Sequence, residues 1–422
     1  MSKLIVSGER TLSGKVRLSG NKNSALKLIA ASLLSDTPTT LVNMPRITDV
    51  SVMCEIVKDL GAKVEGVGTN KIRIDPSGVN KYIIKKGLSG RIRTAPLLIA
   101  PLLLRFGCAQ ISTPGGCSIG KRLLSTHFSL LKSMGAKITK KGDGYFIKFN
   151  PKPRFREVFL EEASVTATEL GLLLASGIKS ETIILDAACE PHVEDLALML
   201  TKMGARIEGA GTNSIKIVGA GNLKGTTHEV IPDYIEAGTW AIASAITHGN
   251  VKIEGVRKED LRMICCYFDH LNIKYSFPGE NIWEIKPSNL RFDGQIKEFQ
   301  TRPWPGFPTD LMSPLIVAAT QAEGQVVCHD WMFEWRIFFV DDLISMGAKI
   351  IIADPHRVFI VGPVKLRGAE MISKDIRAGM AIVLAALAAR GKSVIDNFDV
   401  IERGYEDLEL KLTSLGAEVE KR

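Results

Sequence analysis

The feature that most constrains the fold is a short motif that recurs along the chain at intervals of about 70 residues. A leucine or methionine precedes Gly-Ala, and a charged residue and a β-branched residue follow. Complete copies begin at Leu60, Met134, Met203, Met346 and Leu415, and a degenerate copy without glycine begins at Leu271. Regular recurrence of this kind predicts repeats of one supersecondary unit, six in all.

Each motif predicts the end of one helix and the start of a strand, because glycine is the usual left-handed residue after a helix C-terminus. An amphipathic helix is expected before the motif, for example at 50–60 and 406–415. A short β-branched strand is expected before that helix, for example at 39–43, 182–185 and 251–254. Each repeat opens with a strongly apolar helix, which belongs in a core; the six are 24–34, 95–104, 168–175, 238–245, 311–319 and 379–389.

Six repeats divide into two groups of three, so we expect an α/β fold of two domains. Each domain would be an inside-out barrel, with buried helices surrounded by sheets and outer helices. The midpoint falls at Gly219–Asp233, which predicts a first domain at 22–231 and a second at 1–21 and 232–422. The strand Lys3–Ser7 has no helix of its own and is expected to complete a repeat of the second domain. An active site is expected in the cleft between the domains.

Composition narrows the function. The chain is 45% hydrophobic and 24% charged, and its apolar runs are shorter than the roughly 18 residues of a membrane span. Seven cysteines without CxxC spacing indicate a reducing compartment and argue against zinc. The net charge of +8 is consistent with a solvated basic surface or with an anionic small-molecule substrate. Nucleic acid is disfavoured because no basic run is interleaved with aromatic residues.

Polar residues stand at the starts of the apolar helices, where a core helix does not need them. Ser164 and Asp375 are expected to be N-caps. A cation at a helix N-terminus opposes the helix dipole, unless an anion binds there together with the free backbone N–H groups. This argument selects three cations as candidate anion ligands: Lys22, Arg93 and Arg377. Two more, Arg336 and Arg403, fall in loops before amphipathic helices.

A glycine-rich loop at 114–122 carries the cysteine of greatest interest. Cys117 is followed by Lys121 and Arg122, and adjacent cations favour the reactive thiolate. The alternative is an inert thiol in a flexible surface loop, which this segment alone does not exclude.

Four segments together resemble the enolpyruvyl transferases, most closely the branch that acts on UDP-N-acetylglucosamine: 19–23 (Ser-Gly-Asn-Lys-Asn), the loop 114–122, 307–310 (Phe-Pro-Thr-Asp) and 403–406 (Arg-Gly-Tyr-Glu). The resemblance covers the whole chain. It implies two domains of three units each, the number of repeats found above.

The resemblance implies transfer of the enolpyruvyl group of phosphoenolpyruvate to the 3-hydroxyl of UDP-N-acetylglucosamine with release of phosphate, the committed step of peptidoglycan synthesis. It implies catalytic roles for Lys22, Cys117 and Asp310, with Asp310 as base and Cys117 as acid. The implied phosphoenolpyruvate ligands are Lys22, Asn23, Arg122, Arg336, Arg377 and Arg403. The implied nucleotide-sugar ligands are Asn23, Arg93, Arg122, Leu123, Leu124, Ser125, Thr126, Ser164, Val165, Asp310 and Met332.

The resemblance further implies a cytoplasmic enzyme with no metal, organic cofactor, membrane association or obligate protein partner, and one that fosfomycin inactivates. Several residues depart from the family pattern, all on the nucleoside side: 123–126, Glu162, Thr166 and Tyr234. Two alternatives therefore stay open, a paralogue acting on another nucleotide or nucleotide sugar and a catalytically silent nucleotide-sugar-binding protein. The shikimate-pathway relatives fit less well because they lack the cysteine-bearing loop.

Overall fold

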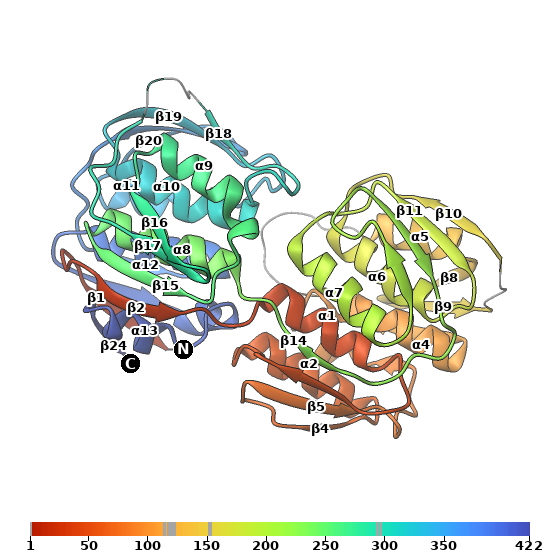
Figure 1. The fold of residues 1–422 in the computed structure, drawn as a ribbon. Helices are drawn as coiled ribbons and strands as arrows, with labels where there is room; N and C mark the ends of the chain where they lie inside the picture. Colours follow the sequence, from red (N-terminus) through yellow and green to blue (C-terminus); the bar gives the residue numbers. More distant parts are fainter. Residues whose placement is uncertain (1, 113–114, 116–123, 151–153, 293, 295–297) are drawn as a thin grey trace. The chain divides into compact units, whose positions relative to one another are not determined.

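The computed structural model describes residues 2–112, 115, 124–150, 154–292, 294 and 298–422 of the chain. These residues form two compact units (Figure 1). The middle unit contains the described residues from Gly20 to Ile231. The terminal unit contains those up to Ser19 and from Pro232 to Arg422. Each unit is considered by itself below.

The middle unit contains three described four-stranded sheets, each with one parallel and two antiparallel pairings. In spatial order the strands are β14 (Thr227–Glu229), β3 (Thr39–Val42), β5 (Lys71–Asp75) and β4 (Lys63–Glu65); β6 (Ile83–Ile84), β7 (Cys108–Ser112), β9 (Gly144–Phe149) and β8 (Ala136–Lys141); and β10 (Arg156–Phe159), β11 (Glu181–Leu185), β13 (Ser214–Val218) and β12 (Arg206–Glu208). Strand β14, from the end of the unit, therefore closes the sheet of the first repeat.

The terminal unit repeats this pattern in its described residues. Its sheets are β16 (Tyr275–Gly279), β17 (Ile282–Ile285), β15 (Asn250–Glu254) and β2 (Ser13–Arg17); β18 (Glu298–Gln300), β19 (Gly324–His329), β21 (Arg357–Gly362) and β20 (Lys349–Asp354); and β22 (Glu370–Ile372), β23 (Lys392–Asp396), β1 (Lys3–Ser7) and β24 (Glu418–Lys421). Strand β1 pairs antiparallel with β23 and β24, which confirms that the N-terminal strand completes a repeat of the second half.

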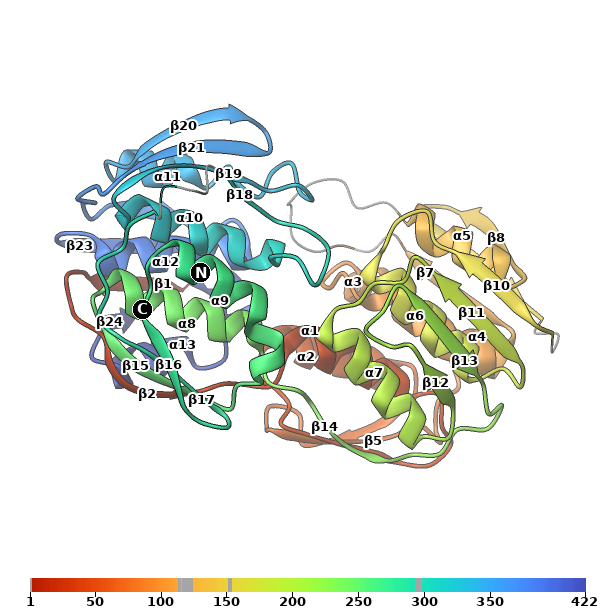
Figure 2. The same ribbon diagram turned by 45° about the horizontal axis from the view of Figure 1, so that its top comes forward.

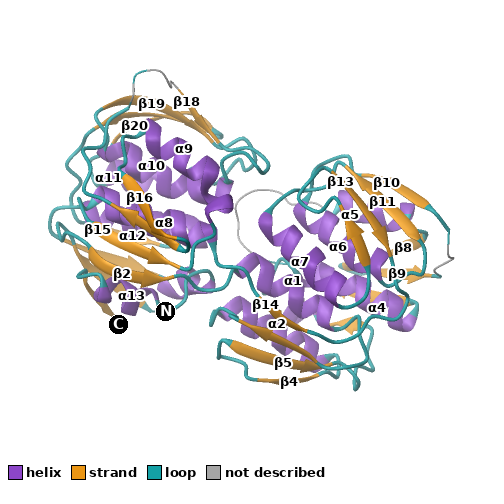
Figure 3. Cartoon of the chain, in the orientation of Figure 1, coloured by secondary structure: helices purple, strands orange, loops and turns teal. Residues whose placement is uncertain are grey.

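The six apolar segments are buried helices, and the sheets lie outside them in each unit (Figure 3). Four of these helices start two to four residues earlier than the hydrophobic pattern predicts, while the second starts at the predicted residue and the fifth one residue later. The helices are α1 (Lys22–Ser32), the 3₁₀ turn η1 (Ala95–Leu98) with α4 (Ile99–Phe106), α6 (Val165–Ser176), α8 (Tyr234–Ile246), α10 (Met312–Gln321) and α12 (Ile376–Ala388). The inside-out α/β fold class is thereby confirmed.

Amphipathic helices accompany the sheets, and Figure 2 shows several of them from a second side. They are α2 (Thr48–Asp59), α5 (Ser125–Ser133), α7 (Pro191–Lys202), α9 (Arg262–His270), α11 (Val340–Ser345) and α13 (Leu408–Ser414); a short helix, α3 (Lys86–Ser89), stands apart from this series. No described helix has both the length and the apolar character needed to cross a membrane.

The glycine of the repeated motif has the predicted conformation in each complete copy. The φ angles of Gly61, Gly135, Gly204, Gly347 and Gly416 lie between 92° and 120°. Asn272 takes this place in the degenerate copy, with φ of 54°. Asparagine is one of the few residues that adopt the left-handed region readily, so the degenerate copy keeps the backbone geometry without glycine.

Candidate active site

In the terminal unit, two arginines converge on one carboxylate. Asp310 lies in a 3₁₀ turn, η3 (Thr309–Leu311), that leads into α10, and its side chain is 25% exposed. Its Oδ1 lies 3.0 Å from Nη1 of Arg336. Its Oδ2 lies 3.0 Å from Nε and 2.9 Å from Nη2 of Arg377. The two guanidinium groups thus share one carboxylate as their counter-ion, that of Asp310.

Asp330 fixes the segment that carries Arg336. This fully buried residue follows β19, and its Oδ1 accepts hydrogen bonds of 3.0 Å from the backbone N–H groups of Met332 and Phe333. Its Oδ2 accepts a 2.7 Å bond from the hydroxyl of Thr309 and lies 3.7 Å from Nε of Arg336. Asp330 therefore joins the Arg336 segment to the turn that holds Asp310, and it places the backbone of the predicted ligand Met332.

Arg377 lies at the start of α12, where the side chain of Asp375 caps the helix by accepting from the N–H groups of Arg377 and Ala378. The capping role expected of Asp375 is confirmed. The Arg377 guanidinium stacks 5.4 Å from the centre of the Tyr405 ring. Burial by itself lowers the pKa of Arg377, but Asp310, Tyr405 and Asp233 together outweigh burial and raise it, so this residue is a permanent cation. Arg403, two residues before Tyr405, ends the 3₁₀ helix η4 (Phe398–Arg403) rather than lying in an open loop.

In the middle unit, Lys22 opens α1 and points to a carboxylate. Its Nζ lies 2.9 Å from Oδ2 of Asp49 in the first turn of α2, and both side chains are almost buried. Asn21 caps the same helix by accepting from the N–H of Ser24 at 2.9 Å, and Asn23 is half-buried in the first turn. Lys22 is therefore oriented by a buried counter-ion at the N-terminus of a core helix.

A second group forms around Arg93, which precedes η1. The imidazole of His127 on α5 makes a 2.8 Å hydrogen bond to the hydroxyl of Thr166 in the first turn of α6. Burial, helped by the positive charge of Arg93, lowers the pKa of His127 to about 4. Burial also lowers the pKa of Arg93 itself. His127 is thus a neutral ring that ties the start of α5 to the start of α6.

The predicted nucleotide-sugar ligands Leu124, Ser125, Thr126, Ser164 and Val165 lie at these same two helix starts. Leu124 precedes α5, and Ser125 and Thr126 are its first residues. Ser164 occupies the N-cap position of α6, but its side chain makes no capping hydrogen bond. The capping role expected of Ser164 is therefore wrong; its backbone carbonyl receives the hydroxyl of Thr168 at 2.9 Å.

Three predicted residues, Cys117, Arg122 and Leu123, lie outside the described part of the chain.

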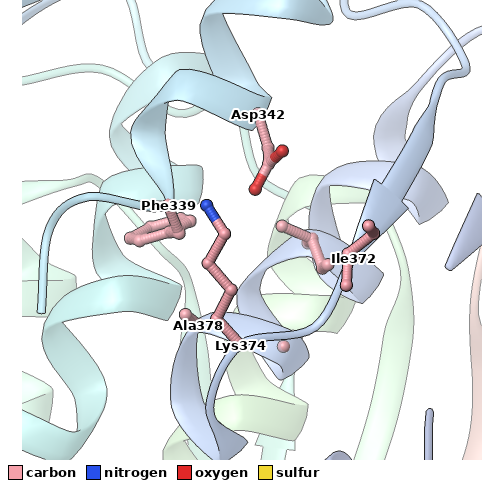
Figure 4. A pocket seen from close by; sticks show the side chains of 7 residues that line it. Phe339, Asp342, Ile372, Lys374 and Ala378 are labelled. Atoms are coloured by element: carbon pink, nitrogen blue, oxygen red, sulfur yellow. The ribbon is translucent and has the colours of Figure 1, made fainter. Parts of the chain in front are cut away.

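A small hollow in the terminal unit holds none of the predicted site residues (Figure 4). Its volume is about 170 Å³, and Phe339, Asp342, Ile372 and Lys374 are among its lining residues. In the close-up, the Lys374 side chain reaches up between Phe339 and Asp342. Even with the open space at its mouth included, the hollow is smaller than the roughly 300–1,000 Å³ of small-molecule ligand pockets, so it does not accommodate a nucleotide sugar.

Comparisons with known proteins establish the family. Residues 6–412 match the sequence profile of the family described as EPSP synthase (3-phosphoshikimate 1-carboxyvinyltransferase). The chain belongs to the EPSP synthase family of enolpyruvyl transferases. Within this family, it is 43% identical over 424 residues to UDP-N-acetylglucosamine 1-carboxyvinyltransferase of Treponema denticola, covering 100% of this chain and 99% of that protein. The protein of the same name from Bradyrhizobium diazoefficiens is 44% identical over 423 residues, covering 99% and 97%.

Solved structures of enolpyruvyl transferases share the fold. The enolpyruvyl transferase NikO from Streptomyces tendae superposes with a TM-score of 0.89 at 24% identity, covering 100% of this chain and 98% of that one. An EPSP synthase from Acinetobacter baumannii superposes with a TM-score of 0.75 at 20% identity, covering 100% and 99%. The family resemblance inferred from the sequence motifs is confirmed.

Sequence reasoning about this enolpyruvyl transferase missed two carboxylates that orient the predicted ligands, Asp49 and Asp330. Asp49 is an acidic residue in the first turn of a helix, which by itself indicates only a favourable dipole contact. Asp330 directly follows a strand and precedes two backbone N–H groups that it binds, a pattern typical of an ordinary turn. Neither pattern indicates which cation the carboxylate contacts, Lys22 for Asp49 and Arg336 for Asp330.

Proposed function

We propose that the protein transfers the enolpyruvyl group of phosphoenolpyruvate to the 3-hydroxyl of UDP-N-acetylglucosamine and releases phosphate. Relatives bearing the name of this activity match the chain over its full length at 43–44% identity. The structural observation that supports the proposal best is the convergence of Arg336 and Arg377 on a single carboxylate. Phosphoenolpyruvate brings such a carboxylate, and paired guanidinium forks suit it.

The proposed chemistry has two halves. In the first, Asp310 takes the proton of the sugar hydroxyl, the oxygen bonds to C2 of phosphoenolpyruvate, and Cys117 donates a proton to C3. In the second, the Cys117 thiolate takes a proton back from C3, and the bond between C2 and the phosphate oxygen breaks. This restores the double bond, and the phosphate leaves with the proton that Asp310 had taken. Lys22, Arg122 and Arg403 are proposed to stabilise the charge on the leaving phosphate.

The pairing of Asp310 with two arginines adds a condition to this scheme. The carboxylate proposed as the base is at the same time the counter-ion of Arg336 and Arg377. When the substrate carboxylate binds Arg336 and Arg377, it competes with Asp310 for the same two guanidinium groups. Substrate binding is thus proposed to release Asp310 for proton transfer.

The remaining ligands are proposed for the acceptor. Asn23, Arg93, Leu124, Ser125, Thr126, Ser164, Val165 and Met332, with Arg122 and Leu123, are proposed to bind the nucleotide sugar. Residues of both units enter the scheme, so we propose that the two units act on one substrate pair. The wider role follows from the reaction: the committed step of peptidoglycan synthesis, carried out in the cytoplasm and blocked by fosfomycin.

A second candidate is a paralogous transferase that acts on another nucleotide. The hydrogen bond between His127 and Thr166 supports this alternative, because Thr166 departs from the usual family pattern and lies at the proposed acceptor side. Phosphate release from phosphoenolpyruvate with UDP-N-acetylglucosamine, UDP-glucose, UMP and shikimate 3-phosphate as acceptors distinguishes the two. We expect the highest kcat/KM with UDP-N-acetylglucosamine and no release with its 3-deoxy analogue. A higher kcat/KM with another nucleotide would move the protein to the paralogous activity.

A further inference from the structure

Helix α1 is a core helix, yet its first half carries three buried polar side chains, each paired with a different element of the middle unit. The three links are Lys22 to Asp49 of α2, the Ser24 hydroxyl to Asp195 of α7, and Lys27 to Glu169 of α6. Beyond Lys27 the helix is apolar apart from Ser32, whose hydroxyl bonds back to the carbonyl of Leu28. The polar links are therefore concentrated near the end of the helix that bears Lys22 and Asn23.

The link between Lys27 and Glu169 is a fully buried ion pair. Nζ of Lys27 lies 3.3 Å from Oε1 of Glu169, and the side chains are 3% and 0% exposed. His192 of α7 also faces the pair, with its Nε2 3.9 Å from the same Oε1. The charges of Lys22, on α1, and of Glu190, which precedes α7, act on the pair as well.

A contribution to stability does not account for this buried pair. Burial lowers the pKa of Lys27, and burial raises the pKa of Glu169 to about 8 despite the opposing charge of Lys27. Both shifts show that desolvation works against the charged forms. Buried ion pairs are in general no more stabilising than well-packed apolar side chains of similar volume, and their best-attested use is to fix register between packed elements.

The position of the pair, close to the starts of two core helices, indicates a role in placing those helix starts. Lys27 lies five residues after Lys22 on α1, and Glu169 lies five residues after Ser164 on α6. Both helices thus begin with proposed substrate ligands, and the pair joins the sixth residue of α1 to the fifth residue of α6. Apolar side chains tolerate small sliding movements between helices, whereas a close contact between an amine and a carboxyl group in a dry core penalises them strongly.

We infer that Lys27 and Glu169 are a positioning pair, which holds α1 and α6 in one axial register so that Lys22 and Asn23 keep their place relative to Ser164 and Val165. The inference rests on the proposed function only in assigning those four residues to substrate. Loss of the pair lets the two helix starts shift, and a ligand that contacts both loses affinity even when the fold is intact.

The experiment compares three double variants with the wild type. Lys27→Met with Glu169→Leu removes both charges at nearly constant volume, so its melting temperature is expected to equal or exceed that of the wild type. Lys27→Glu with Glu169→Lys reverses the pair and keeps the point contact. Leu28→Met with Leu172→Met changes apolar neighbours on the same two helices and serves as the matched control.

The apolar variant is expected to raise the KM for UDP-N-acetylglucosamine by about 10-fold, since misplacement by about 1 Å is enough for effects of this size or more. The reversed pair is expected to return KM to within about 3-fold of the wild type, and the control to leave it unchanged. If the pair only stabilised the fold, KM would rise only in variants whose melting temperature falls. Wild-type KM in the apolar variant, or no recovery in the reversed pair, overturns the inference.

Hydrogen exchange of the unliganded protein gives a readout independent of activity. The first-turn amides of α1 and α6 are expected to exchange faster in the apolar variant than in the control, and equal exchange overturns the inference. Wild-type protein that releases no phosphate would refute the proposed function but would leave this comparison intact. If the apolar variant does not fold, Glu169→Asp replaces it, because this change shortens the carboxylate side chain by one methylene. This variant is expected to raise both the KM and the exchange rate of the first-turn amides. No change in either quantity overturns the inference.

Discussion

Asp310→Asn is expected to weaken the fold as well as the reaction, because Asp310 is the shared counter-ion of two buried arginines. The side chains of Arg336 and Arg377 are only 2% and 7% exposed, and both contact the Asp310 carboxylate. Removing one partner of a buried ion pair costs about 3–5 kcal/mol. For a unit of roughly 200 residues this corresponds to a melting temperature about 10 °C lower.

Calorimetry with and without inorganic phosphate tests this expectation. The variant has no carboxylate to compete for the two guanidinium groups, so phosphate is expected to bind it more tightly and to raise its melting temperature more than that of the wild type. Asp354→Asn is the matched control, since Asp354 pairs with Arg357 on the surface of the same unit. An exposed pair of this kind contributes at most about 1 kcal/mol.

Turnover of the Asp310→Asn variant is expected to fall by about 10²–10⁴, the usual contribution of a general base. An unchanged melting temperature together with an unchanged response to phosphate would refute the counter-ion role. Near-normal turnover would remove Asp310 from the mechanism, whatever its effect on stability.

Two further predictions concern His127 and the cysteines. The pKa of His127 is about 4 in the folded protein and about 6.5 in the unfolded chain, so the unfolded chain binds the proton more readily. The free energy of unfolding is therefore expected to fall by about 3 kcal/mol as the pH falls from 6.5 to 4. Urea unfolding at several pH values measures this dependence, and His127→Gln should remove it. Fosfomycin is expected to alkylate Cys117 alone, because burial raises the pKa of Cys54 to about 12 and that of Cys265 to about 11. Peptide mapping locates the adduct, and the exposed Cys266 serves as the internal control. An adduct on any other cysteine would contradict this prediction.

The sequence by itself determined the elements and their repetition. Helix period, β-branched strands and the left-handed residue after each helix are local properties, and each is encoded by residues near one another in the chain. This is why the motif glycines, and even Asn272 in the degenerate copy, have the backbone conformation that the repeat predicts. The polar residues at the helix starts were likewise visible, because they break an otherwise apolar pattern.

Only the tertiary structure decided which of these polar groups meet. The contact of Asp310 with Arg377 joins residues far apart in the sequence, as does that of Lys27 with Glu169, and no local pattern encodes either. Ser164 illustrates the same limit: it stands where a cap belongs, yet its side chain makes no capping bond. Which side chains become partners depends on how the helices pack and on which charged groups the core shields from water. The interaction energies of such pairs arise only once the chain has folded.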